Sequence, residues 1–230
     1  MPKIQIETKK MTKYYPTGEG LFAALKDVTL NFTEGEFAGI VGPSGSGKTT
    51  LLNVIGSLDT QSEGEVIVLG KEVSKLNAKE SAALRSEHIG FIFQTYNLLP
   101  VYTVYENVEF PLLLLKMPDA ERQKAVMDAL DWVGLTDKAK SRPTQLSGGQ
   151  SQRVAIARAM VKKPQIVLAD EPTANLDTEN SMNVLETMEK LNKELGTTYI
   201  FSTHDAKVIA FIRRKITLVD GRVDSDVIIG

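Results

Sequence analysis

The chain has 230 residues, of which 42% are apolar and 24% are charged, and its formal net charge is −2. This length can bury one large core or a core with an inserted subdomain, and the near-neutral charge argues against a broad nucleic-acid-binding surface. The chain contains no Cys, which excludes disulfides and thiolate metal sites and fits a reducing compartment. Residues 1–7 form no apolar signal core, and every apolar stretch is far shorter than the ~20 residues of a membrane span. We therefore expect any membrane role to depend on a partner protein.

An apolar run at 37–41 predicts the first central strand, and a glycine-rich segment follows it directly. That segment, which precedes a helix starting near Thr50, is Gly42-Pro43-Ser44-Gly45-Ser46-Gly47-Lys48-Thr49. It fits G-x-x-x-x-G-K-[ST], the phosphate-binding loop of nucleoside triphosphatases, in the strand, loop, helix order that the motif requires. Glycines let the backbone N–H groups turn toward phosphate oxygens, and the helix N-terminus adds partial positive charge. We expect Lys48 to reach the β- and γ-phosphates and Thr49 to bind Mg²⁺; a Gly-Ser-rich surface turn is the alternative.

Later apolar runs predict more strands. They lie at 65–69, 89–93, 165–169, 198–202 and 215–219. The runs 166–169 and 199–202 are nearly continuous in apolar residues, like 37–41, which is typical of central strands buried on both faces. Helical patterns lie between several of these runs, for example at 178–195. The alternation predicts a mostly parallel α/β sheet.

The middle of the chain differs, because residues 95–161 show no clear strand pattern. Residues 119–133 predict an amphipathic helix that ends at Gly134. Its apolar face consists of Ala125, Val126, Ala129, Leu130 and Val133. We therefore divide the chain into an α/β core of residues 1–94 and 162–230, and an inserted helical subdomain of residues 95–161.

A second candidate phosphate-binding segment, Leu146-Ser147-Gly148-Gly149-Gln150, precedes a helix predicted at about 151–160. Ser147 supplies a hydroxyl, the two glycines allow close backbone approach, and the helix dipole favours an anion. Considered alone, a Ser N-cap with a flexible glycine pair is an equally good interpretation. The Lys48 loop already occupies one side of a γ-phosphate. We therefore hypothesise that the second segment caps a nucleotide held by another copy of the chain.

The buried strand 166–169 runs into two adjacent carboxylates, Asp170 and Glu171. Successive side chains at a strand end point to opposite sides, so we expect different roles for the two. Asp170 fits a Mg²⁺ ligand, direct or through water, and Glu171 fits a general base that polarises the attacking water. Solvated surface charge is the alternative, which the apolar strand before them and Pro172 after them disfavour.

Several of these segments, in order, resemble the motif set of ABC-type ATPases over nearly the whole chain. They are Gly42–Thr49, Gln94, Leu146–Gln150, Ile166–Glu171 and His204. The resemblance implies an α/β P-loop NTPase core with a mostly parallel sheet, an N-terminal antiparallel β portion and an inserted α-helical subdomain. It also implies ATP and Mg²⁺ as cofactors. It further implies a head-to-tail homodimer that encloses two ATP molecules, each between the Lys48 loop of one chain and Ser147 of the other.

The resemblance also assigns roles to single residues. It implies that His204 contacts the γ-phosphate and positions the water, and that Tyr15 stacks on adenine. From the residues alone, a histidine between a strand and a helix, such as His204, is more often a cap or packing residue. Tyr15 can also be an edge-strand aromatic, and Tyr14 is the neighbouring candidate. Gln94 ends the run 89–93, and its amide oxygen can bind Mg²⁺ weakly, although an ordinary polar strand end is the alternative.

The predicted site has three parts. The catalytic residues are Glu171 and His204. The metal ligands are Thr49, Gln94 and Asp170. The ATP-binding residues are Tyr15, Gly42, Pro43, Ser44, Gly45, Ser46, Gly47, Lys48, Thr49 and Thr50 and, from the other chain, Ser147, Gly148, Gly149 and Gln150.

Residues 94–100 and 106–112 are similar to the lipoprotein-releasing (LolD-type) and macrolide-export (MacB-type) branch, and 142–145 and 172–177 are closer to the lipoprotein-releasing type. This resemblance implies a homodimeric ATPase on the cytoplasmic face of the inner membrane. Its partner would be a permease with four transmembrane helices and a large extracytoplasmic domain. Apolar residues near Tyr102, Val104 and 112–115 are candidates for the docking groove or, equally, for the core of the helical subdomain.

Two other functions are compatible with the motif set. One is an FtsE-like ATPase that works with a cell-division permease and moves no substrate. Such relatives tend to have a histidine-rich segment where this chain has Tyr96-Asn97. The other is an assembly or DNA-maintenance ATPase, although such proteins usually carry coiled-coil arms or a second cassette, neither of which the sequence shows.

Overall fold

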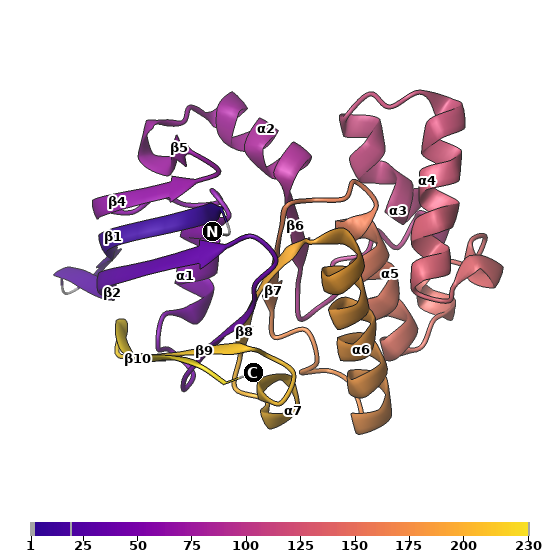
Figure 1. Cartoon of the computed structure of the whole chain (residues 1–230). Coiled ribbons are helices and arrows are strands. Elements are labelled where there is room, and N and C mark those ends of the chain that lie inside the picture. Colours follow the sequence, from indigo (N-terminus) through magenta and orange to yellow (C-terminus); the bar gives the residue numbers. More distant parts are fainter. Residues whose placement is uncertain (1–2, 19, 230) are drawn as a thin grey trace.

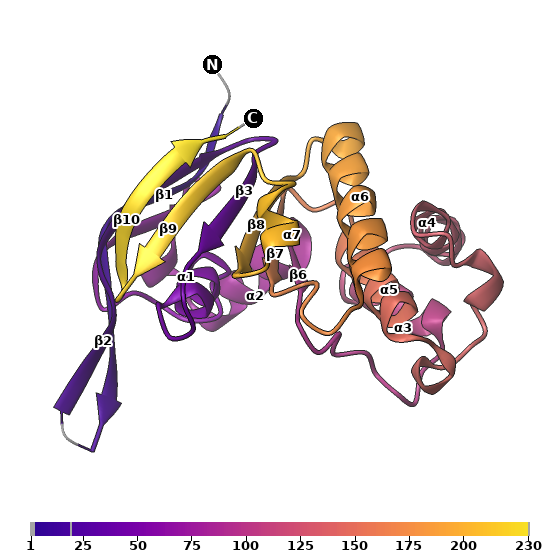
Figure 2. The same ribbon diagram turned by 90° about the horizontal axis from the view of Figure 1, so that it is seen from below.

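The computed structural model describes residues 3–18 and 20–229, which form two sheets and a set of helices (Figure 1). The smaller sheet is antiparallel and has the strand order β2-β1-β4-β5. Its strands are β1 (Ile4–Thr17), β2 (Gly20–Thr33), β4 (Glu63–Val68) and β5 (Lys71–Glu72). The two long strands β1 and β2 form a hairpin whose tip extends away from the rest of the molecule (Figure 2).

The larger sheet has six strands in the order β10-β9-β3-β8-β7-β6. Its strands are β3 (Phe37–Val41), β6 (Ile89–Ile92), β7 (Ile166–Asp170), β8 (Thr198–Thr203), β9 (Arg214–Val219) and β10 (Arg222–Ile228). Adjacent strands from β9 to β6 are parallel, and only β10 pairs in the antiparallel sense. The carboxyl ends of β3, β7 and β8 therefore lie together at one edge of the sheet.

The helices are α1 (Lys48–Ile55), α2 (Ala78–His88), α3 (Val104–Leu114), α4 (Asp119–Trp132), α5 (Gly148–Met160), α6 (Thr178–Leu195) and α7 (Ala206–Ile209). Helices lie on both faces of the larger sheet, but α4 packs mainly on α3 and α5 (Figure 1). Short 3₁₀ turns occupy Val73–Lys75, Thr136–Lys138 and Pro143–Gln145. No helix within 3–18 and 20–229 is both long and apolar enough to cross a bilayer.

The alternation of side chains along β7 shows how the core is divided. Ile166 and Leu168 pack with α1 and the antiparallel sheet, whereas Val167 and Ala169 pack with α5 and α6 on the opposite face. Successive residues of a strand point to opposite faces, so a central strand needs apolar residues at every position. This explains why β7 is a continuous apolar run.

The segment 95–161 carries α3, α4 and α5, which lie at the opposite end of the molecule from the β1–β2 hairpin (Figure 2). Helix α4 buries Val126, Ala129 and Leu130. Gly134, with φ 64°, follows the helix in the left-handed conformation that commonly ends a helix.

The predicted fold class is confirmed, including the antiparallel portion, the mostly parallel sheet and the added helices. The predicted helix at 178–195 coincides with α6. The predicted start of α5 at about 151 is wrong, because the helix begins at Gly148. The Ser147 hydroxyl accepts the Gln150 N–H at 3.2 Å, and the Gln150 side chain accepts the Ser147 N–H at 2.9 Å, so this reciprocal cap starts the helix three residues earlier.

Candidate functional site

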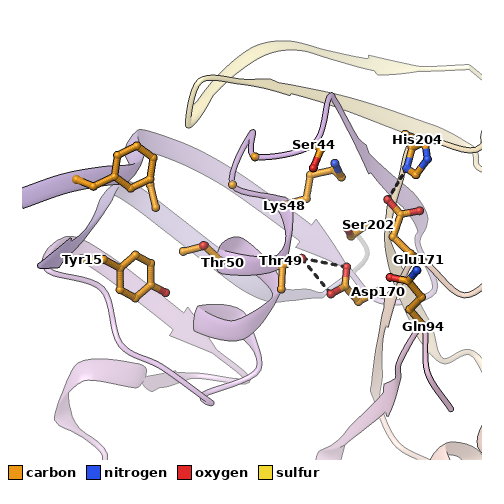
Figure 3. Close-up of a pocket in the computed structure, with 14 residues that line it drawn as sticks. Tyr15, Ser44, Lys48, Thr49, Thr50, Gln94, Asp170, Glu171, Ser202 and His204 are labelled. Carbon is orange, nitrogen blue, oxygen red and sulfur yellow. Dashed lines mark hydrogen bonds and ion pairs between the residues drawn. The ribbon is translucent and has the colours of Figure 1, made fainter. Parts of the chain in front are cut away.

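A cavity of about 460 Å³ opens at the carboxyl ends of β3, β7 and β8. It is elongated, with Tyr15 at one end, His204 at the other, and Lys48 and Thr49 between them (Figure 3). The lining residues are Tyr15, Phe22, Ala24, Ser44, Gly45, Gly47, Lys48, Thr49, Thr50, Gln94, Asp170, Glu171, Ser202 and His204. The structure thus gathers predicted site residues from five separate parts of the chain at one cavity.

The loop after β3 makes the centre of this cavity. Gly45 and Gly47 have φ angles of 81° and 102°, a region that glycine enters without the steric cost of a side chain. A Cβ at Gly47 would lie 2.6 Å from the Ala24 carbonyl oxygen, so no larger residue fits there. Gly47 is also the N-cap residue of α1 and supplies no side-chain cap, which leaves the first N–H groups of the helix available to an anion.

Lys48 is only 8% exposed, and its Nζ donates to the carbonyl oxygens of Gly42 and Pro43 at 2.8 and 3.0 Å. These contacts hold the ammonium inside the loop. Of the predicted loop residues, Gly42, Pro43 and Ser46 do not line the cavity, and Ser46 is buried beneath it. The Gly42 backbone approaches β9 closely, because a Cβ there would lie 2.1 Å from the Leu218 carbonyl oxygen.

The predicted metal ligands meet below Lys48. The Thr49 hydroxyl donates to the two Asp170 carboxylate oxygens at 3.2 and 3.0 Å, and the Gln94 amide lines the same cavity (Figure 3). Hydroxyl, carboxylate and amide oxygens are the hard ligands that Mg²⁺ prefers. Within the part of the chain that the structure describes, no three His, Cys, Asp or Glu side chains cluster as a metal site. A Mg²⁺ ion here therefore needs oxygens from a bound phosphate, as in other phosphate-binding loop enzymes.

A serine hydroxyl in the cavity supports this fit. Ser202 lines the cavity, and its Oγ is buried and has no hydrogen-bond partner among the described residues. A buried polar atom without a partner costs free energy, on the order of 1–3 kcal/mol, unless a ligand or water satisfies it. The donor set and this hydroxyl therefore fit a magnesium-bound polyphosphate.

Glu171 and His204 line the end of the cavity that lies opposite Tyr15 (Figure 3). Glu171 Oε1 lies 2.7 Å from His204 Nδ1, and the Thr203 hydroxyl donates to Glu171 Oε2 at 3.4 Å. The Glu171 side chain is 15% exposed and that of His204 is 70% exposed. Asp170 points to Thr49 instead, so the two adjacent carboxylates have different partners (Figure 3).

Glu171 also has an unusual backbone. Its φ is 46°, and its N–H donates to the Ser202 carbonyl oxygen at 2.9 Å. A non-glycine residue in this region costs on the order of 1–3 kcal/mol, and such residues concentrate at functional sites. The strained turn directs the carboxylate into the cavity beside Ser202.

The second glycine segment lies outside this cavity. None of the residues from Ser147 to Gln150 lines it, and Ser147 and Gly148 are exposed on the surface. Gly149 is buried against α6, where a Cβ would lie 2.1 Å from Asn180 Oδ1. The Ser147 hydroxyl caps α5 through its own N3 residue, so the N-cap interpretation describes its contacts within one chain.

Sequence reasoning missed three lining residues, Phe22, Ala24 and Ser202. Phe22 and Ala24 belong to β2 and reach the cavity only because β2 pairs with β1. Ser202 carried a usable signal, because it is a polar residue near the end of an otherwise apolar strand. Tyr14, the alternative to Tyr15, does not line the cavity.

The chain matches known proteins over most of its length. Residues 25–174 match the family model described as ABC transporter. The ABC transporter ATP-binding protein MJ0796 of Methanocaldococcus jannaschii is 46% identical over 225 residues, which are 96% of each chain. The macrolide export ATP-binding/permease protein MacB of Burkholderia pseudomallei is 45% identical over 96% of this chain, which spans 34% of that longer protein.

The fold matches as well. A dimeric structure of the cassette MJ0796 in a post-hydrolysis state, bound to ADP and Pi, superposes with a TM-score of 0.90 at 44% identity. The match covers 97% of this chain and 98% of that one. Together with the phosphate loop, the Thr49–Asp170 pair and the Glu171–His204 pair, these matches show that the chain belongs to the ATP-binding proteins of ABC transporters and is an ATPase that uses ATP with Mg²⁺.

Proposed function

We propose that two copies of this chain close head to tail around two MgATP molecules and thereby drive a membrane permease. The observation that carries this proposal is the separation of the two glycine segments. The Lys48 loop lies inside the cavity, whereas Ser147 and Gly148 are exposed outside it. A triphosphate held by Lys48 leaves its outer side open, and an exposed helix start from another copy can cover that side. The dimeric structure of the related cassette supports the arrangement.

Each predicted residue has a role in this proposal. Lys48 and the N–H groups at the start of α1 hold the β- and γ-phosphates, and Thr49, Asp170 and Gln94 hold Mg²⁺. The metal, when bound, neutralises charge on the phosphate oxygens. Glu171 accepts a proton from the attacking water, which a carboxylate at this position can do through Oε1 or Oε2.

His204 acts beside Glu171. Its Nδ1 contacts Glu171 Oε1 at 2.7 Å, which leaves its exposed Nε2 edge free to face the γ-phosphate. We also propose that residues 95–161 act as one helical subdomain that presents Ser147 to the other chain, while residues 1–94 and 162–230 hold the nucleotide.

The permease would dock in an apolar groove of about 480 Å³ between the core and this helical subdomain. Its apolar lining includes Leu58, Phe91, Phe93, Phe110, Pro111 and Leu114. Leu114, which lines the groove, is 61% exposed, as a contact surface requires. Val104 and Leu112 are fully buried and belong to the core, so two of the residues suggested for docking are excluded.

We propose a permease of the lipoprotein-releasing or macrolide-export type, with four transmembrane helices and an extracytoplasmic domain, and hence a position on the cytoplasmic face of the inner membrane. The likeness to MacB, which joins an ATP-binding part to a permease in one protein, supports this. An FtsE-like regulatory ATPase is the second candidate, and Tyr96-Asn97 argues against it as described above.

The test has two stages. The purified protein should hydrolyse ATP only with Mg²⁺, and size-exclusion chromatography with light scattering should show an ATP-dependent dimer of a Glu171→Gln variant. A chain that stays monomeric at saturating MgATP would refute the head-to-tail site. Co-purification from detergent extracts with a permease, followed by a transport assay in vesicles, then separates transport from regulation.

A further inference from the structure

The Tyr15 end of the cavity contains a set of polar contacts that the proposed function does not use. Tyr15 Oη donates to Asp59 Oδ2 at 2.9 Å, and Lys13 Nζ contacts Asp59 Oδ1 at 2.6 Å. Lys13 also donates to the Thr60 carbonyl oxygen at 2.7 Å, and the Thr60 N–H donates to Asp59 Oδ1 at 2.7 Å. Asp59 thus links strand β1 to the turn that follows α1.

These contacts fix the tyrosine ring as well as its hydroxyl. Lys13 Nζ lies 5.0 Å from the centre of the Tyr15 ring, within the range of a cation–π contact. The Lys13 side chain is 11% exposed, and Lys13 does not line the cavity, whereas Tyr15 does. The ammonium therefore covers one face of the ring without lining the cavity, and Tyr15 itself contributes to the lining.

The electrostatics support a permanent anchor. Burial raises the pKa of the Asp59 carboxyl, but hydrogen bonds from Lys13, the Thr60 N–H and Tyr15 outweigh burial and hold that pKa below its usual range. Burial and the Asp59 hydrogen bond raise the pKa of the Tyr15 hydroxyl, so it stays protonated and keeps donating. The anchor is therefore present across the physiological pH range.

A second aromatic ring faces the same space. Phe22 lies directly opposite Tyr15 in the β1–β2 register and also lines the cavity. Residues directly opposite in an antiparallel pair project from the same face of the sheet. Phe22 is 55% exposed although it is a large apolar residue, which leaves its ring available to a planar ligand.

We infer that Lys13 and Asp59 are positioning residues that hold Tyr15 as a stacking surface for a nucleobase, and that Phe22 is the second wall of this base site. The inference rests on the proposed nucleotide site, because it places the base at the Tyr15 end when Lys48 holds the phosphates. A ring locked in place before binding loses little side-chain freedom when the base arrives. Stacking accepts any planar base, so the site should hold adenine and guanine with similar affinity.

The test compares ATP with inorganic tripolyphosphate, which has the phosphates and lacks the base. Dissociation constants are measured by calorimetry with Mg²⁺ for the wild type, Tyr15→Phe, Asp59→Asn, Lys13→Met and Phe22→Ala. Tyr15→Phe keeps the ring and removes only the anchor, and we expect it and the two positioning variants to weaken ATP binding about 3- to 10-fold. Phe22→Ala should weaken it by roughly 5-fold or more. Tripolyphosphate affinity should change less than about twofold in all four.

A spectroscopic measurement separates positioning from general stability. The triphosphate of 2-aminopurine riboside loses fluorescence when its base stacks, so quenching should be strong in the wild type and reduced in Tyr15→Phe and Asp59→Asn. Glu65→Gln is the matched control, because Glu65 forms an exposed ion pair with Lys9 in the same sheet, at 3.1 Å, away from the cavity. Leu21→Ala, next to Phe22 and 72% exposed, is the control for Phe22→Ala.

The outcomes are distinct. If Tyr15→Phe and Asp59→Asn bind ATP as tightly as the wild type and quench the fluorescence as strongly, the inference is overturned. Equal losses for ATP and tripolyphosphate would also overturn it, because the variants would then act on the phosphate loop or on folding. A wild-type protein that binds neither ligand would refute the proposed function itself.

Discussion

Two helix starts in this molecule have similar sequences and different structures. Helix α1 begins at Lys48 after the N-cap residue Gly47, which has a left-handed backbone and no side-chain cap, and its first residues line the nucleotide cavity. Helix α5 begins at Gly148, and its N-cap residue Ser147 lies on the surface and exchanges hydrogen bonds with Gln150. A helix N-terminus therefore does not make a phosphate site by itself. The cavity at the start of α1 is built within one chain, whereas the start of α5 lies outside that cavity and carries its own cap.

The two helices are also attached differently. Helix α1 is held by apolar packing between the two sheets, with Leu51, Val54 and Ile55 fully buried. Helix α5 has apolar packing too, but it is also joined to the catalytic segments by polar contacts. Gln152 donates to the Pro172 carbonyl oxygen at 2.8 Å, and Arg158 donates to the carbonyl oxygens of Tyr96 and Asn97.

These contacts connect α5 to the segment that carries the proposed metal ligand Gln94 and to the segment that carries the proposed general base Glu171. Pro172 follows Glu171, and Tyr96-Asn97 follow Gln94 by two and three positions. A shift of α5 on contact with a second chain would move these segments with it. Four variants test this difference between the starts of α1 and α5.

The largest effect should come from Glu171→Gln. Turnover should fall by roughly 10²- to 10⁴-fold, because the amide cannot accept the proton of the attacking water. ATP binding should persist, and the dimer that joins the two helix starts should accumulate. Steady-state ATPase assays and light scattering measure both effects, with Glu186→Gln on the exposed side of α6 as the control. Near-normal turnover would remove Glu171 from the role of base.

Lys48→Ala should weaken ATP binding about 10- to 150-fold, the equivalent of losing a charge-assisted contact of roughly 1.5–3 kcal/mol. The same change removes the Lys48 donor from the Gly42 and Pro43 carbonyl groups, so thermal unfolding of the nucleotide-free protein must be measured beside calorimetry. Lys124→Ala, at an exposed position of α4, is the control. Unchanged affinity would contradict the role of Lys48 and the contrast with α5.

Ser147→Ala tests the other helix start, and Thr103→Ala is its matched control. Thr103 caps α3 with the same reciprocal contacts, to Glu106, that Ser147 makes to Gln150. Both variants should lose about 1 kcal/mol of stability. Only Ser147→Ala, placed in the Glu171→Gln background, should weaken the ATP-driven dimer, by about tenfold, as seen by sedimentation. Equal dimerisation of the two variants would mean that Ser147 is a helix cap and nothing more.

The smallest effect concerns the far end of α5. Lys162 follows this helix, and its Nζ donates to the Arg85 and Ser86 carbonyl oxygens of α2 at 2.6 and 2.8 Å. Burial lowers the pKa of the Lys162 amine to about 8, from 10.5. Between about pH 8 and pH 10.5 the Lys162 amine is protonated in the unfolded chain and largely neutral in the folded protein. The free energy of unfolding therefore rises with pH in this window, and below about pH 8 Lys162 does not make it depend on pH.

Compared with Lys162→Met, the wild type should therefore gain roughly 0.5–1 kcal/mol of unfolding free energy per pH unit from pH 8 upward. Urea denaturation at several pH values measures the difference, with the exposed Lys163→Met as control. If the difference in unfolding free energy between the wild type and Lys162→Met does not change over this range, the amine keeps its proton, and α5 is held on α2 by a charged contact.

Much of the site could be predicted because its motifs are local. The Lys48 loop and the bounds of α6 follow from residues that are neighbours in sequence, although α1 begins at Lys48, two residues before its predicted start. The β1–β2 hairpin was harder, because its register shifts several times along two 14-residue strands and no simple alternation marks it. For Ser147, local patterns supported a cap and a ligand contact equally. The structure shows the cap, and the contact with a nucleotide of another chain stays a proposal.

The sequence by itself determined the phosphate loop, because glycine backbone geometry, a lysine and a helix start act over about ten residues. It also determined the buried central strands, since a strand covered on both faces requires a continuous apolar run. Tertiary structure alone decided the pairing of Glu171 with His204, of Tyr15 with Asp59, and of Tyr15 with Phe22. The first two pairs join residues 33 and 44 positions apart, and such contacts depend on how strands and turns pack, which local residue patterns do not encode.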